Sequence, residues 1–284
     1  MTTTELVTTC WALDPFAVLA SSGAVLAYVM WARRAPRAGA AERQLGTRAI
    51  AFSAALLLFV LALVSPIGTL ANGYLFSAHM LQHLMLVLVV PPLALLGLGA
   101  REPSPSVAGR ASGPLSRAAL HPALTWGLGV GAMWLWHAPT LCNAASRGAV
   151  MLRVQELSLL GMGTLFWLPI VGPITRARLS PLAGALYLFT ACVACTLLGI
   201  LVTFSPVEVC SIFLHPVDRL GVMPLLREGW GLSAARDQQL GGLFMWVPAC
   251  LIYGAGILGL LARWYRSDAQ LETPHAIASS QETS

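Results

Sequence analysis

The sequence has no lysine and little charge of either sign: charged residues make up 10% of its 284 residues, and hydrophobic residues make up 57%. A soluble domain carries about 25% charged residues. The mean hydropathy of +0.73 agrees with this bias, so the composition indicates an integral membrane protein. The 17 basic residues are all arginines that stand between apolar runs. The net charge of +5 therefore does not indicate nucleic-acid binding.

The sequence also lacks the features of a secreted, disulfide-stapled or β-barrel protein. The amino end carries Glu5 and Asp14 without a basic segment, so we expect no cleaved signal peptide. Strands of alternating polarity are absent, which leaves a helical bundle as the architecture that satisfies its backbone inside a bilayer. We expect no disulfide framework, because the cysteines are scattered: Cys10, Cys142, Cys192, Cys195, Cys210 and Cys250.

Seven apolar runs approach the roughly 20 residues that a helix needs to cross the hydrocarbon core. They predict an all-α, polytopic membrane protein with a seven-helix transmembrane domain over residues 1–266 and a polar, disordered cytoplasmic tail over residues 267–284. The predicted spans are Pro15 to Ala32, Arg48 to Val64, Leu75 to Leu98, Ala118 to Trp136, Ala149 to Val171, Leu182 to Phe204 and Gln239 to Ala262.

The distribution of arginine predicts the orientation. Arginines follow the first, third, fifth and seventh runs, whereas on the other side they are fewer and are diluted by acidic residues. The positive-inside rule therefore places the amino terminus outside and the carboxyl terminus in the cytoplasm. The arginines on the predicted cytoplasmic side are Arg33, Arg34, Arg37, Arg43, Arg48, Arg101, Arg110, Arg117, Arg176, Arg178, Arg263 and Arg266.

Two histidines lie inside the third apolar run. His79 and His83 are four residues apart, so on a helix they share one face at about 5 to 6 Å. Ionisable side chains are costly inside a membrane and usually face a functional site. The alternative is that both rings form hydrogen bonds to neighbouring helices. Pro91 and Pro92 follow and should kink or loosen the inner half of this helix.

A third histidine is expected at the same depth. The fourth run ascends and ends at His137, while the third descends from outside, so His79, His83 and His137 all fall near the outer face. Imidazoles from two distant segments at one level predict a metal site. The alternative for His137 is an interfacial ring that caps a helix before Pro139. The segment from Pro206 to Arg236 should lie along this surface, where it can cover the site or meet a partner.

Further side chains at this face are candidates for ligands or for groups that orient an imidazole through its other nitrogen. Each has a structural alternative, either hydrating a helix end or filling the core. The Cys192 and Cys195 pair lies in mid-membrane, where packing or a transient copper relay would explain it. The candidates are Cys142, Glu156, Asp237, Gln238, Met80 and Met245.

Four motifs occur in this order: SPIGTLANGYLFSAHMLQHLMLVLVVPPLALLG, WLWHAP, LFWLPIVGP and DQQLGGLFMWVP. On these motifs the chain resembles, from about Ser65 to Trp246, the membrane-integral CtaG family of cytochrome c oxidase assembly factors. The resemblance implies a role in forming active haem-copper oxidases, for which copper insertion is commonly inferred. It supports as site residues His79, Gln82, His83, His137, Asp237 and Gln238.

The chain departs from the family at the start of the fifth run. Family members often carry histidines in the stretch that matches MLRVQELS here, whereas this chain has Leu152, Arg153, Gln155 and Glu156. A site that needs those imidazoles would be incomplete unless Glu156 substitutes for one of them. The identity of the metal therefore stays open.

We expect a non-enzymatic assembly factor in the bacterial cytoplasmic membrane that holds copper transiently and passes it to a haem-copper oxidase subunit. Imidazole with thioether or thiolate suits copper, and few hard oxygen ligands are present. The expected partners are oxidase subunits and membrane lipid, and a homo-oligomer is left open. The alternatives are a zinc-dependent intramembrane hydrolase with Glu156 or Asp237 as its base, a haem- or quinone-binding protein, a copper permease and a scaffold without metal.

Overall fold

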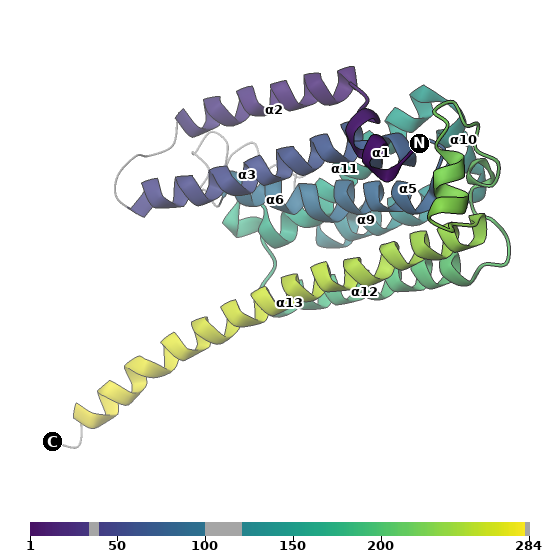
Figure 1. Cartoon of the computed structure of the whole chain (residues 1–284). Helices are drawn as coiled ribbons and strands as arrows, with labels where there is room; N and C mark the ends of the chain where they lie inside the picture. The colour runs from purple at the N-terminus through teal and green to yellow at the C-terminus, as the bar shows by residue number, and fades with distance from the viewer. Residues whose placement is uncertain (34–39, 100–120, 282–284) are drawn as a thin grey trace.

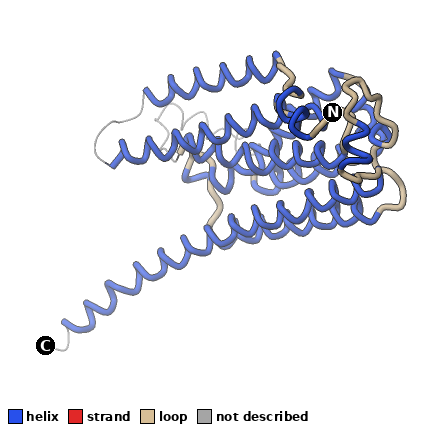
Figure 2. Tube along the Cα trace, viewed as in Figure 1, coloured by secondary structure: helices blue, strands red, loops and turns tan. Residues whose placement is uncertain are grey.

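The computed structural model describes residues 1–33, 40–99 and 121–281, and every regular element in these ranges is helical (Figures 1 and 2). The α-helices are α1 Thr3–Thr9, α2 Pro15–Arg33, α3 Ala40–Val64, α4 Pro66–Ala71, α5 Phe76–Leu84, α6 Val90–Leu98, α9 Pro122–Trp136, α10 Pro139–Arg147, α11 Ala149–Val171, α12 Pro181–Phe204 and α13 Ala234–Gln281. Four short turns complete the description: π-type η1 Met85–Val89 and η4 Leu225–Gly229, and 3₁₀-type η2 Thr175–Ala177 and η3 Ser211–Phe213.

Six helices in the described part of the chain are long and apolar enough to cross a membrane. The fourth predicted span corresponds to α9, which has 15 residues; residues 118–120 of that prediction lie outside the described ranges. α9 nevertheless packs inside the bundle, because Gly129 lies against Phe166 of α11 and Thr125 lies 3.3 Å from the Tyr187 hydroxyl of α12. The six spans are Pro15–Arg33, Leu45–Val64, Phe76–Leu98, Ala149–Val171, Pro181–Phe204 and Ala234–Ser267.

The carboxyl-terminal helix is longer than its predicted span. α13 continues to Gln281, so it is helical through most of the region, residues 267–284, where the sequence predicts a disordered tail. Figure 1 shows α13 extending well past the other helices, with the carboxyl terminus at the opposite end of the molecule from α1 and α10. The division into a membrane domain and a separate tail stays a prediction.

The span formed by α5, η1 and α6 is the central one. In its most apolar window 61% of the residues are buried, compared with 6% for α2, which lies at the edge of the bundle (Figure 1). α12 and α13 run side by side, and their small residues allow close contact: Gly199 lies against Trp246, and Gly242 lies against Thr203. The central position of α5 surrounds its histidines with protein on all sides.

The predicted loosening of the central span occurs at η1. Pro91 has no backbone N–H, so it cannot donate to the carbonyl of Val87 four residues earlier. A residue of another helix satisfies this carbonyl instead: Nε1 of Trp167 on α11 donates to the Val87 oxygen at 3.2 Å. A π-type turn and a tertiary hydrogen bond therefore replace regular α-helix below the two histidines.

One end of the bundle is closed by short elements, namely α1, α10, η3 and η4 (Figure 1). Cys142 of α10 forms a disulfide with Cys210, which immediately precedes η3. The scattered cysteines led us to expect no disulfide framework, but this pair forms one disulfide. The 68 residues between the partners give no local spacing pattern, so only the tertiary fold reveals the pair. The bond fastens the segment after α12 to the segment after α9.

Candidate metal centre

The three predicted histidines are neighbours. His79 and His83 lie one turn apart on α5 with ring centroids 4.2 Å apart, and the ring of His137 lies 5.7 Å from that of His83. Their exposed fractions are 1%, 2% and 5%, so all three rings are buried within protein. The fold therefore brings together side chains from α5 and from the residue that ends α9.

Asp237 fixes the start of the helix that carries two of these rings. Its Oδ2 accepts a hydrogen bond from the Phe76 N–H at 2.7 Å, and its Oδ1 accepts from the N–H and the hydroxyl of Ser77 at 3.0 and 2.6 Å. A carboxylate at this position stabilises the amino terminus of a helix. The structure thus shows Asp237 holding the start of α5, and its role as a metal ligand stays a prediction.

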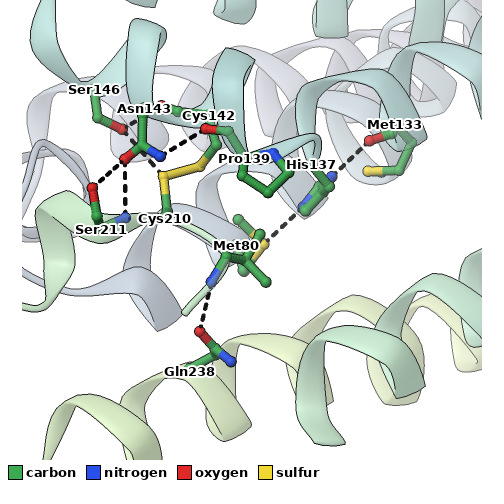
Figure 3. The surroundings of a disulfide bond; sticks show 11 residues. Met80, Met133, His137, Pro139, Cys142, Asn143, Ser146, Cys210, Ser211 and Gln238 are labelled. Atoms are coloured by element: carbon green, nitrogen blue, oxygen red, sulfur yellow. Dashed lines mark hydrogen bonds between the residues drawn. A yellow bond between two sulfur atoms is a disulfide. The ribbon is translucent and has the colours of Figure 1, made fainter. Parts of the chain in front are cut away.

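The hydrogen bonds of His137 determine which of its nitrogens is available. Nδ1 lies 2.6 Å from the carbonyl oxygen of Met133, and since a carbonyl only accepts, Nδ1 carries the proton and donates (Figure 3). In the neutral ring Nε2 is then a bare acceptor, and it lies 3.1 Å from Sδ of Met80. A histidine that donates one N–H to a carbonyl while its other nitrogen is bare has the arrangement typical of metal-bound histidines.

Polar atoms without partners surround these rings. Ten buried side-chain nitrogen and oxygen atoms in the described part of the chain form no hydrogen bond of normal geometry, and six of them lie here: Nδ1 and Nε2 of His79, Nδ1 of His83, Oε1 of Gln82, and Oε1 and Nε2 of Gln155. Each such atom costs about 1–3 kcal/mol, and native proteins contain few of them. Their concentration at one place indicates a site built for a ligand. We call His79, Met80, Gln82, His83, His137 and Gln155 the histidine cluster.

The two glutamines of the histidine cluster differ in how they are held. Nε2 of Gln82 donates to the carbonyl of Ala62 on α3 at 3.0 Å, which leaves Oε1 available. Gln155 on α11 is 0% exposed, and its amide lies close to the His83 ring without forming a hydrogen bond of normal geometry. From the sequence, Gln155 was expected only as a departure from the family pattern. The available signal was a polar residue in an apolar helix at the depth of the histidines.

Glu156 points to a different partner. Arg153 donates to its carboxylate at 2.6 Å and lies at the same distance from the carboxylate of Asp14 before α2. The Glu156 carboxylate is therefore engaged in a buried ion pair, and its role as a ligand stays a prediction. The adjacent Gln155 is the residue of this stretch that lies close to the His83 ring. This three-residue group fastens the amino-terminal segment to α11.

Cys142 is not available as a thiolate ligand, which corrects its candidacy, because its sulfur is bonded to Cys210 (Figure 3). The same contact region is held by Asn143, whose Oδ1 accepts from the N–H and hydroxyl of Ser211 at 2.9 and 2.8 Å. These bonds place η3 so that the Phe213 ring lies 5.5 Å from that of His79. Phe213, in the segment after α12, therefore packs beside the ring of His79.

The remaining two candidates have structural contacts. Gln238 accepts from the N–H of Val209 at 3.0 Å, and its amide nitrogen lies 3.3–3.4 Å from three carbonyl oxygens that follow or end α12, those of Val202, Ser205 and Val207. Met245 lies in the core beside α12, where the Cys195 thiol donates to its carbonyl. Gln238 therefore fastens a loop, and Met245 packs between α12 and α13.

Within residues 1–33, 40–99 and 121–281, no three His, Cys, Asp or Glu side chains are arranged as a group that could hold a metal ion. The imidazoles are close together but do not form a complete set of converging ligands by themselves. The other donors of the histidine cluster are the Met80 thioether and the two glutamine amides.

Comparison with protein families matches residues 26–267 to the cytochrome c oxidase caa3 assembly factors (Caa3_CtaG). Searches of the curated proteins and of the solved structures each found no match. The matched region includes every residue of the histidine cluster and runs from within α2 to residue 267 within α13. Since the match covers most of the chain, the protein belongs to the Caa3_CtaG family of cytochrome c oxidase caa3 assembly factors.

Proposed function

We propose that this protein binds copper in the histidine cluster and delivers it to a haem-copper oxidase subunit during assembly of the enzyme. Membership of the family gives the assembly role. The observation that supports copper is the set of buried, unpartnered nitrogen and oxygen atoms around His79 and His83, next to the bare Nε2 of His137 and the sulfur of Met80. Imidazole and thioether groups suit copper better than they suit calcium or magnesium.

We further propose that the bundle crosses the bacterial cytoplasmic membrane seven times, with α9 as the short fourth crossing and the amino terminus outside. The Cys142–Cys210 disulfide supports this orientation, because disulfides persist in oxidising compartments, and it lies at the end where α5 begins. At the opposite end Arg178 donates to the carbonyls of Gly172 and Val171 after α11. Burial and the nearby Arg263 lower the pKa of Arg178, so two arginines lie together on the proposed cytoplasmic side.

Delivery requires that the ion can leave. A cluster that lacks a complete set of three or four converging protein ligands binds more weakly than a closed structural site and leaves positions for a receiving ligand. The partners are therefore an oxidase subunit at the end that bears α10 and η3, and lipid along the bundle. The lipid-facing surface includes exposed apolar residues of α12, namely Leu182, Leu186, Phe189, Val193 and Leu197. The oligomeric state is not part of the proposal.

The contacts of the carboxylates favour a carrier over a zinc-dependent hydrolase. A hydrolase needs a general base beside the metal-bound water. Asp237 is used by three donors at the start of α5, and Glu156 is paired with Arg153. A haem protein would show Soret absorption after purification, and a permease would carry labelled copper into proteoliposomes. We expect neither result.

The proposal is tested by copper analysis of the purified wild type beside His79→Ala/His83→Ala. The double variant should lose the bound copper, since it removes two imidazoles that form the centre of the cluster. His215→Ala is the matched control, because this histidine is exposed on the loop after η3. Equal copper content in the wild type and the double variant would reject copper binding and leave a scaffold for oxidase assembly.

A further inference from the structure

We propose that the cation held by the histidine cluster is monovalent copper(I), and that Met80 Sδ and His137 Nε2 are two of its ligands. This inference rests on the proposed function, because it assumes that the cluster binds copper. It adds the valence of the cargo, a thioether ligand, and a reason why divalent ions are rejected.

The contact between Met80 and His137 joins two atoms that each carry a free electron pair. Nδ1 of His137 donates to the Met133 carbonyl, so Nε2 of the neutral ring has no proton to give to the Met80 sulfur 3.1 Å away. When two lone-pair atoms face each other with no hydrogen between them, the contact is not stabilising unless a cation lies between or beside them. Metal–nitrogen and metal–sulfur bonds of ordinary length at a tetrahedral angle place the two donors about 3.5 Å apart. A small outward shift of the flexible Met80 side chain supplies that difference.

The charge of the side chains in the cluster also favours a monovalent cation. Histidine, methionine and glutamine side chains are neutral ligands, so the cluster offers no negative charge to the cation. The electrostatic cost of moving an ion from water into a medium of low dielectric constant rises with the square of its charge, which makes a divalent ion about four times as costly as a monovalent one of the same size. The side chains of the histidine cluster are 0–5% exposed, so this cost applies here.

The carboxylates nearest to the histidine cluster are bound to other protein groups. Asp237 is bound to the amino terminus of α5 by three hydrogen bonds. The carboxylates of Asp14 and Glu156 both lie 2.6 Å from the Arg153 guanidinium, so they are engaged by an arginine. Zinc(II) and copper(II) therefore lack an anionic ligand in the cluster, whereas copper(I) is compatible with imidazole and thioether ligands alone.

The test measures cation preference in the purified full-length protein under anaerobic conditions. Copper(I) affinity is obtained by competition with a chromophoric copper(I) chelator, and silver(I) serves as a monovalent probe that does not change valence. Zinc(II) is measured in parallel. Met80→Leu is the variant, because leucine keeps the volume and apolar character of methionine. Met245→Leu is the control, because it makes the same change at a buried methionine of the α12–α13 interface.

We expect the wild type to bind copper(I) and silver(I) more tightly than zinc(II). Met80→Leu should lower copper(I) affinity by about tenfold or more, since the loss of even a group that supports a ligand costs that much. Met245→Leu should bind as the wild type does. X-ray absorption of the copper-loaded wild type should show sulfur in the first coordination shell, and this measurement does not depend on the folding of any variant.

The results distinguish failure of the copper(I) thioether site from failure of copper binding as a whole. If copper binding requires His79 and His83 but survives Met80→Leu unchanged, or if no sulfur neighbour is seen, the copper(I) thioether site is rejected and the proposed function stands. Zinc(II) binding as tight as copper(I) binding also rejects the inference. If His79→Ala/His83→Ala binds copper like the wild type, or if the wild type binds none, the proposed function itself fails.

Discussion

Two regions of the bundle contain soft or nitrogen donors, and they differ in how those donors are satisfied. The histidine cluster lies at the end of the bundle where α5 begins, and the thiols of Cys192, Cys195 and Cys250 lie between α12 and α13. Around the histidines, six buried polar atoms have no partner. The thiols all have one: Cys192 donates to Cys250 at 3.2 Å, Thr196 lies 3.3 Å from Cys250, and Cys195 donates to a backbone carbonyl.

This difference shows that donor type alone does not identify a metal site. The CVAC pattern in the sequence suggests a pair made of Cys192 and Cys195, but the thiol of Cys192 contacts Cys250 on the neighbouring helix. Cys192 and Cys250 are only half-buried, and their contacts join two helices. Buried groups that are already hydrogen-bonded contribute to packing, whereas buried groups without partners are available to a ligand.

The largest effect is expected from a single substitution in the histidine cluster compared with one in the thiols. His83→Ala removes the ring that lies beside both His79 and His137, so copper content of the purified protein should fall to background. Cys250→Ala should retain the wild-type copper content. In cells that depend on this factor, the copper-to-haem ratio of the oxidase should fall with His83→Ala only. Loss of copper with both variants would abolish the distinction between the two regions.

A smaller effect is expected from changing a residue that is outside the histidine cluster but positions the helix that carries it. Asp237→Asn keeps the size of the side chain but weakens the charge-assisted bonds to the start of α5, so copper affinity should fall about 10–100-fold, as for residues that position ligands. Asp218→Asn is the control, since Asp218 accepts two backbone N–H groups on an exposed loop. Rescue of affinity by Asp237→Glu, with α5 still capped, would distinguish positioning from general damage to the fold.

The helical framework was predictable from hydrophobic runs because each span is a local property of the sequence. The predicted and observed bounds agree for α11, Ala149–Val171, and differ by one residue at the start of α12 and of the central span. The loosening before Pro91 also follows from local chemistry. The helical continuation of α13 to Gln281 did not follow, because the polar composition of that segment indicated disorder.

The site was predictable only as far as its histidines. Their helical spacing and common depth suffice to place His79 and His83 near His137, but the roles of their neighbours depend on contacts between distant segments. Asp237 acts on residues 160–161 positions away, and Cys142 bonds to a cysteine 68 positions away. The sequence contains these carboxylate, thiol and amide side chains but does not show which of them are already bonded to other protein groups.

Gln155 allows a test in which stability and binding should change in opposite directions. Gln155→Leu removes two buried, unpartnered polar atoms, so the metal-free protein should gain about 1 kcal/mol or more of stability, while copper affinity falls. Gln238→Leu makes the same chemical change at an amide that is hydrogen-bonded, and it should lose stability instead. Thermal unfolding in detergent, with and without copper(I), measures both quantities. A loss of stability in both variants would show that the Gln155 amide is satisfied after all.

The smallest effect is expected from removing the thiols together. Cys192→Ala/Cys195→Ala/Cys250→Ala deletes weak thiol hydrogen bonds and little volume, and exposed or half-buried sites away from special features usually change stability by about 0.5 kcal/mol or less. Cys195 is the exception, because it is 6% exposed and packs in the main core, so most of any loss should arise there. Copper stoichiometry and transfer to the oxidase should remain at wild-type levels. If transfer stops while copper content is unchanged, the thiols act after the histidine cluster on the path of the ion, and the two regions are parts of one route rather than a site and a packing contact.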